Sequence, residues 1–248
     1  MAIKTCGRAI KCLAFVGLAA LAAAEAEAGF THVNATGGGA ELGHAAILSH
    51  AYGGAFAAEG VNFSNGAGLI AERCADYGDG AKPDQCWDGA IVSARVIARF
   101  AGHEQTLGVL DGEHGGSFRA LFTVAGQGLD VAGSAAGPDL AGRSYRFARG
   151  GGGHVLSSLQ ADNGGAADQM VSYRLAGPAG APQKFVLFFE DLGADEGSDW
   201  DYNDLVVEVT TAGDPAAVPL PPAVWSGLTV LLTSGLWGGR ARLRRWFT

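Results

Sequence analysis

The chain has 248 residues, of which 48% are hydrophobic and only 17% are charged, and its formal net charge is −8. This hydrophobic content is ample for a core and excludes a disordered chain, and the 40 glycines indicate many turns and short strands. The excess of acid excludes a basic surface of the kind that binds nucleic acid or anionic lipid.

The amino-terminal end has the three parts of a secretory signal. Three basic residues precede an apolar core at 13–21, and an Ala-Glu-Ala triplet at 26–28 provides a cleavage site with small residues. We therefore predict that residues 1–28 are a signal peptide and that the exported body begins at Gly29. A cut after Ala24 and an uncleaved membrane anchor are the alternatives.

The exported body is more acidic than the whole chain. Without the signal and the arginines near the carboxyl end, 10 basic and 23 acidic residues remain between 29 and 218, so the net charge is about −13. Such a surface attracts divalent cations and repels nucleic acid. We expect no nucleic-acid partner.

Short apolar segments in the body predict one helix followed by strands. We expect an edge strand at 30–34 and a short helix within 41–52, where apolar residues recur at helical spacing. From residue 69, runs of strand length alternate with Gly- and Asp-rich turns, and the candidate strands are 69–74, 91–100, 118–124, 144–148, 155–159, 170–175, 185–189 and 205–209. This pattern predicts that residues 29–212 form one mainly β domain of the β-sandwich or jelly-roll type.

Two cysteines, Cys74 and Cys86, remain after removal of the signal. An even pair in an oxidising compartment favours a disulfide, which would close a turn-rich loop and stabilise the fold by roughly 3 kcal/mol. Zinc binding is the alternative, although no further Cys or suitably spaced His completes four ligands.

We find no set of residues that indicates catalysis. His103-Glu104 and Glu113-His114 have no partners at catalytic spacing, and Ser157 lies outside a Gly-x-Ser-x-Gly sequence. The glycines at 150–153 have no Lys-Ser or Lys-Thr after them and indicate a hairpin tip. We expect Trp87 to fill the core. The sequence thus predicts a protein that is not an enzyme.

The most informative stretch is 185–209, in which two apolar runs flank a loop rich in acid and without Lys or Arg. Two carboxylates about 4 Å apart repel by roughly 4 kcal/mol near a protein surface, so such a loop either holds a cation or disperses its charges into water. An antiparallel strand pair would bring the two ends of the loop together. Oxygen donors without Cys or His favour Ca²⁺, and the candidate ligands are Glu190, Asp191, Asp199, Asp201, Asn203 and Asp204. A solvated acidic hairpin at 190–204 is the alternative.

The sequences Phe189-Glu190-Asp191 and Asp201-Tyr202-Asn203-Asp204-Leu205 resemble the signature of domain of unknown function 4114. A weaker resemblance, at 51–54, 84–89 and 98–103, is to the first half of exported proteins that end in this motif. The family occurs in secreted bacterial proteins. The resemblance implies an extracellular β-rich domain associated with calcium, and it supplies no reaction.

The carboxyl-terminal end has three parts: a Pro-rich linker at 213–222, and within 223–248 an apolar stretch followed by a basic cluster. Seventeen helical residues span about 25 Å, which is enough to cross a membrane with some thinning. We predict a transmembrane helix with a cytoplasmic basic cluster, formed by Arg240, Arg242, Arg244 and Arg245.

This three-part end resembles the PEP-CTERM sorting signal in its Val-Pro-Leu-Pro variant, here Val218, Pro219, Leu220 and Pro221; Pro222 stands where Ala is usual. The resemblance implies an exosortase-type processing enzyme as a partner and an anchored precursor in the inner membrane. After cleavage the product would pass to the cell surface or the extracellular matrix of a biofilm. A permanent anchor is the alternative.

Every strong signal concerns export, sorting or cation binding. We therefore predict a non-enzymatic protein of the cell surface or matrix, stabilised by Ca²⁺. The alternative is a carbohydrate-binding module or adhesin that binds exopolysaccharide, with Trp200 and Tyr202 as ligand platforms; a glycan-active enzyme is a third, weaker possibility.

Overall fold

The computed structural model describes residues 30–37, 41–76, 84–138, 140, 142–164, 168–176, 182–193 and 197–212. The predicted signal at 1–28, the linker with its sorting motif at 213–222, and the predicted membrane helix with its arginines at 223–248 lie outside the described residues. Within the described ranges, no helix combines the length and the hydropathy that a membrane crossing requires.

The described residues form two antiparallel sheets. The larger has nine strands in the order β1-β2-β3-β11-β12-β13-β4-β7, with β8 also paired to β4. These strands are β1 (Ala57–Glu59), β2 (Asn62–Ser64), β3 (Ile70–Arg73), β4 (Ile91–Arg99), β7 (Gly128–Leu129), β8 (Ser134–Ala136), β11 (Met170–Leu175), β12 (Gln183–Phe189) and β13 (Leu205–Thr211). β12 pairs with β13, as the apolar runs on either side of the acidic loop predict.

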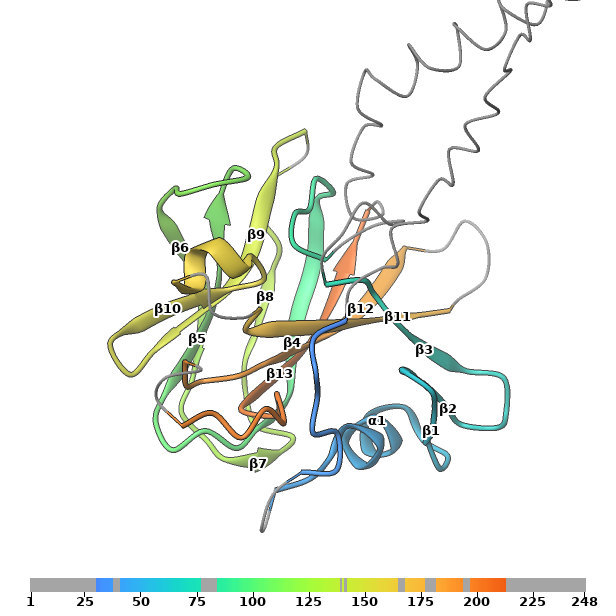
Figure 1. The fold of residues 1–248 in the computed structure, drawn as a ribbon. Coiled ribbons are helices and arrows are strands. Elements are labelled where there is room, and N and C mark those ends of the chain that lie inside the picture. The colour runs from blue at the N-terminus through green and yellow to red at the C-terminus, as the bar shows by residue number, and fades with distance from the viewer. Residues whose placement is uncertain are drawn as a thin grey trace, which may run out of the picture.

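The smaller sheet has four strands in the order β10-β9-β5-β6. They are β5 (Gln105–Asp111), β6 (Phe118–Val124), β9 (Tyr145–Gly151) and β10 (His154–Ser157), and a 3-10 helix, η1 (Gln160–Asn163), follows β10. The turn between β9 and β10 uses Gly152 and Gly153, both with positive φ, so the predicted hairpin tip is confirmed. Figure 1 shows this sheet on the left, beside the central strands of the larger one.

The first core lies between the two sheets and makes the domain a β-sandwich, as predicted. Val109 and Phe147 of the small sheet pack in one cluster with Phe185 and Val207 of the large sheet. Trp87 completes this cluster, since its ring lies edge-on to Phe147 at 5.0 Å and to Phe185 at 4.7 Å. Its predicted place in the core is confirmed.

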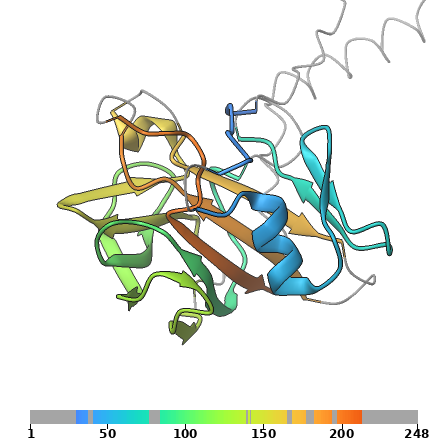
Figure 2. The ribbon, with the colours of Figure 1, turned by 90° about the horizontal axis from the view of Figure 1, so that it is seen from below.

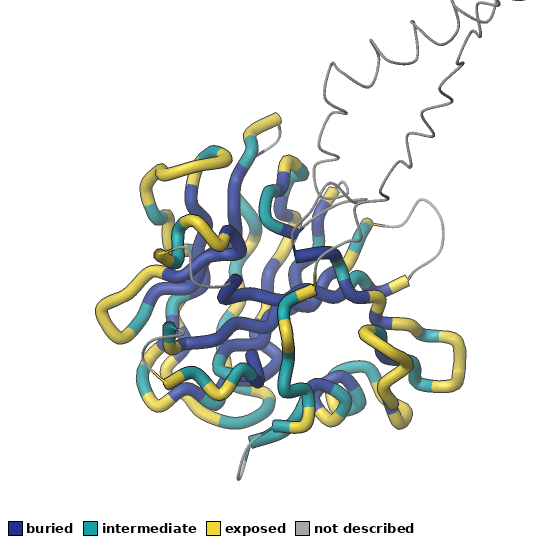
Figure 3. Tube along the Cα trace, in the orientation of Figure 1, coloured by how far each residue is buried: buried dark blue, intermediate teal, exposed yellow. Residues whose placement is uncertain are grey.

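The second core lies on the other face of the large sheet, under α1 (His44–Tyr52), the one α-helix of the described residues. The helix falls within the predicted range, and its Ile47 and Leu48 pack with Val186 and Phe188 of β12. Figures 1 and 2 show α1 lying across this face. Because both faces are covered, β12 and β13 are buried along almost their whole length (Figure 3).

The alternation of Glu208 with the apolar Val207 and Val209 predicts that β13 has one solvent-exposed face, and this prediction is wrong. Glu208, which suggested that face, is only 6% exposed. Its carboxylate accepts hydrogen bonds from Arg95 Nε (2.9 Å) and from the Tyr52 hydroxyl (2.8 Å). A buried charge is tolerated here because it is paired and hydrogen-bonded.

The predicted edge strand at 30–34 is absent. This segment is irregular and lies against loops: the Thr31 amide donates to Asp76, and the Asn34 amide donates to the Trp200 carbonyl at 2.7 Å. The whole of β5 escaped prediction because Gly108 interrupts its apolar pattern. Only glycine fits there, since a Cβ atom would lie 2.5 Å from the Phe118 ring and the Arg119 carbonyl.

The predicted disulfide between Cys74 and Cys86 is not formed, and both are free cysteines. Cys74 packs against the core between the sheets, where burial raises the pKa of its thiol to about 12. Cys86 lies in different surroundings, near the charges of Arg146, Glu113 and Asp162. A suitable spacing in the sequence could not reveal that the two thiols face different environments.

Candidate metal centre

The register of β12 and β13 brings the two ends of the acidic loop together. Phe189, the last residue of β12, is paired with Leu205, the first residue of β13. Glu190 and Asp191 therefore lie next to Asp204, whose carboxylate accepts a hydrogen bond from the Asp191 amide at 2.8 Å. One carboxylate oxygen from each of these three acids lies within 4.8 Å of the others.

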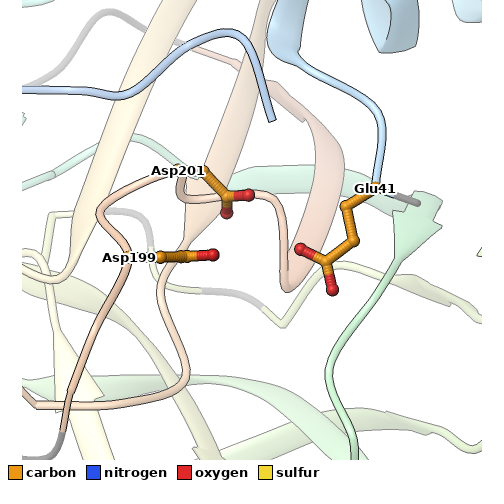
Figure 4. Close-up of side chains that lie close together, drawn as sticks. All are labelled: Glu41, Asp199 and Asp201. Atoms are coloured by element: carbon orange, nitrogen blue, oxygen red, sulfur yellow. The ribbon is translucent and has the colours of Figure 1, made fainter. Parts of the chain in front are cut away.

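A second group consists of Glu41, Asp199 and Asp201, and one carboxylate oxygen of each also lies within 4.8 Å of the others. Figure 4 shows the three carboxylates turned toward a shared space, two from the loop and one from the segment that leads into α1. Sequence reasoning missed Glu41, because it is 158 residues from Asp199 and stands alone among apolar and small residues.

The two groups border a pocket of about 350 Å³ that is open to solvent. The described residues that line it include five acids and no Lys or Arg: Glu41, Phe100, Gly102, His103, Glu190, Asp191, Leu192, Gly197, Asp199 and Asp204. Four of the six predicted ligands, Glu190, Asp191, Asp199 and Asp204, are thus brought together at one surface depression.

The carboxylates are partly removed from water, and this changes their proton affinity. Burial, with the charges of Asp191 and Glu190, raises the pKa of Asp204 to about 9. Burial and the Asp199 charge raise the pKa of Glu190 to about 7, and burial raises that of Asp201 to about 6. Without a cation, the pocket therefore retains protons at neutral pH that ordinary carboxylates would release.

The backbone on both sides of Asp201 adopts the left-handed conformation, with φ of 61° at Trp200 and 55° at Tyr202. Such residues cost free energy unless the surroundings fix them. His44 supplies part of that support: its Nε2 lies 2.7 Å from the Asp201 carbonyl and its Nδ1 lies 3.0 Å from the Tyr173 hydroxyl. Burial lowers the pKa of His44 to about 3, so its ring is neutral and Nε2 donates to the carbonyl.

The remaining predicted site residues are placed differently. Asn203 does not line the pocket; its amide NH₂ donates to Asp201 (2.6 Å) and to the Leu42 carbonyl (3.3 Å), so it positions a neighbouring acid. Tyr202 is fully buried, with its hydroxyl bonded to the Asp168 carbonyl at 2.8 Å, and cannot present its ring to a ligand. Trp200 is half-buried and lies outside the lining of the pocket.

Residues of the small sheet support the pocket from behind. The buried Arg149 of β9 donates from Nε to the Glu190 carbonyl at 3.1 Å and from Nη2 to the Asp191 carbonyl. Gln105 of β5 donates from Nε2 to the Asp191 carboxylate at 3.4 Å. His103, which precedes β5 and lines the pocket, has its Nδ1 3.6 Å from the same carboxylate. The guanidinium thus fixes the backbone of two acids, which leaves their carboxylate oxygens directed to one another. No local feature of the sequence predicts these contacts.

Comparison with known proteins gives little that bears on this site. No family model matches the chain, and no curated protein matches it. One similar solved structure is that of the lectin CV2L of Chromobacterium violaceum in complex with α-methyl-fucoside. It is 19% identical to this chain, the match covers 51% of this chain and 94% of the lectin chain, and the TM-score is 0.35. The C-terminal domain of the lectin BC2L-C of Burkholderia cenocepacia is 17% identical, with coverages of 50% and 94% and a TM-score of 0.32.

Proposed function

We propose that this protein binds Ca²⁺ in the acidic pocket and acts as a non-enzymatic, cation-stabilised protein. One observation carries the proposal: Glu190, Asp191 and Asp204 come from the ends of two paired strands and place carboxylate oxygens within 4.8 Å of one another. Three carboxylates at that separation repel strongly unless they take up protons or share a cation. A divalent ion with six to eight oxygen ligands relieves the repulsion of the whole set.

The donor chemistry favours Ca²⁺ over other divalent ions. The candidate ligands supply hard oxygen atoms, and the opening to solvent leaves room for water in the remaining coordination positions. His103 is the one described imidazole in the lining, and it faces Asp191. A zinc site with several nitrogen or sulfur ligands is therefore disfavoured.

The sequence signals for export and sorting complete the proposal. A signal at 1–28, a sorting motif at 218–221 and a helix with a basic end at 223–248 would take the protein through an inner-membrane precursor to the cell surface or matrix. An exosortase-type enzyme would process the tail. The calcium concentration outside a cell is suited to the weaker affinities that extracellular modules display.

Calorimetry on the full-length chain tests the cation site. After treatment with EDTA and its removal, titration with CaCl₂ is expected to release or absorb heat and to raise the melting temperature by roughly 5–10 °C at a hundredfold excess over Kd. KCl at equal ionic strength is the control for charge screening. Absence of both heat and thermal shift at millimolar CaCl₂ would remove the proposed function.

Carbohydrate binding is the second candidate, and the form of the pocket favours it. The depression has the volume of a small-molecule site, and apolar side chains, Phe100 and the 38%-exposed Leu192, stand beside its acids. A Ca²⁺ ion held there could complete its coordination with sugar hydroxyls, while the apolar walls contact the ring carbons.

A glycan array probed with the full-length chain tests this candidate. We expect binding in CaCl₂, loss of binding in EDTA, and about tenfold weaker binding for Leu192→Ala than for wild type. Val92→Ala, which truncates an apolar residue on β4 that is 51% exposed and not in the pocket, is the matched control. An array that stays blank in CaCl₂ rejects carbohydrate binding and leaves the cation site standing.

A further inference from the structure

A third group of acids lies away from the pocket and is almost fully buried. Asp76 and Asp84 are 0% exposed and Asp168 is 2% exposed, and one carboxylate oxygen of each lies within 4.8 Å of the others. None of the three lines the pocket. Tyr202 of the acidic loop lies next to this cluster, since its hydroxyl donates to the Asp168 carbonyl at 2.8 Å.

Strand pairing explains why these residues meet. β3 pairs antiparallel with β11, so the segment after β3 runs beside the segment before β11 (Figure 1). The Cys74 amide extends this pairing by donating to the Ser172 carbonyl at 2.9 Å. Asp76 follows β3 and Asp168 precedes β11. The Asp84 amide donates to the Ala75 carbonyl at 2.7 Å, which brings the third acid alongside.

Several oxygens of this cluster make no hydrogen bond of ordinary geometry within the described residues, although the Ser172 hydroxyl lies close to Asp84. Both carboxylate oxygens of Asp84 and Oδ2 of Asp168 are in this state. The other contacts are accounted for: Oδ1 of Asp168 accepts from the Met170 amide at 3.0 Å, and Asp76 accepts from the Thr31 amide. A buried carboxylate without donors is costly, so these oxygens point to a ligand that supplies positive charge.

The formal charge of the cluster matches a divalent cation. Arg73 pairs with Asp76, at 2.8 Å from Nη2 to Oδ2 and 3.3 Å from Nε to Oδ1. Arg73 and Asp76 neutralise each other. The formal charge that remains is that of Asp84 and Asp168, which is two negative units. Of the described residues, no cysteine or histidine joins the group, so its donors are oxygens only.

We propose that Asp76, Asp84 and Asp168 hold a second, buried Ca²⁺ ion whose role is structural. The ion would fasten the segment around Asp84 to the adjoining ends of β3 and β11. Trp87 belongs to that segment, because its indole Nε1 donates to the Asp84 carbonyl at 2.6 Å, so the ion also anchors the largest side chain of the core between the sheets. Asp76 and Asp84 flank the loop that the sequence suggested a disulfide would close.

Counting ions in variants of the full-length chain tests this site independently of the pocket. EDTA-treated wild type, titrated with CaCl₂, is expected to bind two ions. Asp84→Asn is expected to lose one and keep the pocket ion, whereas Asp204→Asn loses the other. Asp168→Asn, whose amide oxygen can still accept from the Met170 amide, is a second variant in case Asp84→Asn does not fold; circular dichroism checks the fold of each.

Luminescence with Tb³⁺ locates the ion. In the Asp204→Asn background, excitation of tryptophan is expected to give Tb³⁺ emission, and Trp87→Phe is expected to abolish most of it, because this indole adjoins Asp84. Trp200→Phe, a change in the half-buried residue of the acidic loop, is the matched control.

The outcomes separate the two sites. A single ion removed by Asp204→Asn but not by Asp84→Asn or Asp168→Asn overturns the buried site and leaves the pocket. A single ion removed by Asp84→Asn or Asp168→Asn supports the buried site and overturns the pocket. Emission that survives Trp87→Phe unchanged places the Tb³⁺ elsewhere and also overturns the inference.

Discussion

Asp204→Asn is expected to stabilise the metal-free protein and to abolish its stabilisation by Ca²⁺ at the pocket. At neutral pH, folding without a cation forces Asp204 to take up a proton, because burial and the charges of Asp191 and Glu190 raise its pKa to about 9. Asparagine is neutral already, and its oxygen can still accept from the Asp191 amide. We expect the free energy of unfolding in EDTA to increase by about 1–3 kcal/mol.

The measurement is thermal unfolding of wild type and variant in EDTA and in CaCl₂. Glu59→Gln, which removes one charge from an exposed position on β1 at the far edge of the large sheet, is the matched control and should change neither curve by more than about 0.5 kcal/mol. A variant that is less stable than wild type in EDTA would show that the Asp204 carboxylate does not destabilise the metal-free protein. If CaCl₂ stabilises the variant as much as it stabilises wild type, Asp204 is not a calcium ligand.

A second large effect is expected from pH in the absence of metal. Glu190, with a pKa raised to about 7, and Asp204, with a pKa raised to about 9, bind protons more tightly in the folded than in the unfolded chain. Between the unfolded pKa values near 4 and these folded values, the folded state holds more protons, so stability falls as pH rises. The expected loss between pH 7 and pH 9 is on the order of 2 kcal/mol.

Urea unfolding in EDTA at pH 7, 8 and 9 measures this slope. His44 does not affect it, because its pKa is lowered to about 3 when folded and an unfolded histidine is deprotonated above about pH 7. Saturating CaCl₂ should flatten the slope, since the ion takes the place of the protons, and Asp204→Asn should reduce it. Equal stability of the metal-free wild type at pH 7 and pH 9 would refute the strained-carboxylate account of the pocket.

Sequence patterns predicted the elements whose residues are apolar in succession. The helix within 41–52 and the strands around β3, β4, β6 and β9–β13 are all present because burial on a helix or strand leaves a local periodic pattern. β5 carries a glycine for a close approach by β6, and the short strands β1, β2, β7 and β8 have too few residues for a pattern. Those strands exist because of contacts made in the folded chain.

The residues of the candidate sites also fall into two groups, those that a local sequence pattern predicts and those that only the folded chain brings together. The acids of the pocket that lie in one loop could be predicted, because antiparallel pairing necessarily joins the two ends of a hairpin loop. Glu41 and Arg149 could not, since each reaches the pocket through packing of a different layer. The buried cluster joins Asp76 to Asp168, 92 residues apart, and each of its acids alone looks like an ordinary turn residue. The prediction of a disulfide was wrong because the spacing of two cysteines in the sequence carries no information on the surroundings of each thiol.

The contact between the His44 ring and the Asp201 carbonyl joins residues 157 positions apart. Contacts of such long range form late, because the chain must close a large loop before they contribute. The pocket consequently cannot be assembled while the chain is still emerging from the ribosome. A cation bound at the pocket would be captured only after β13 has docked, so a chain cut short before β13 would present scattered acids and no binding site.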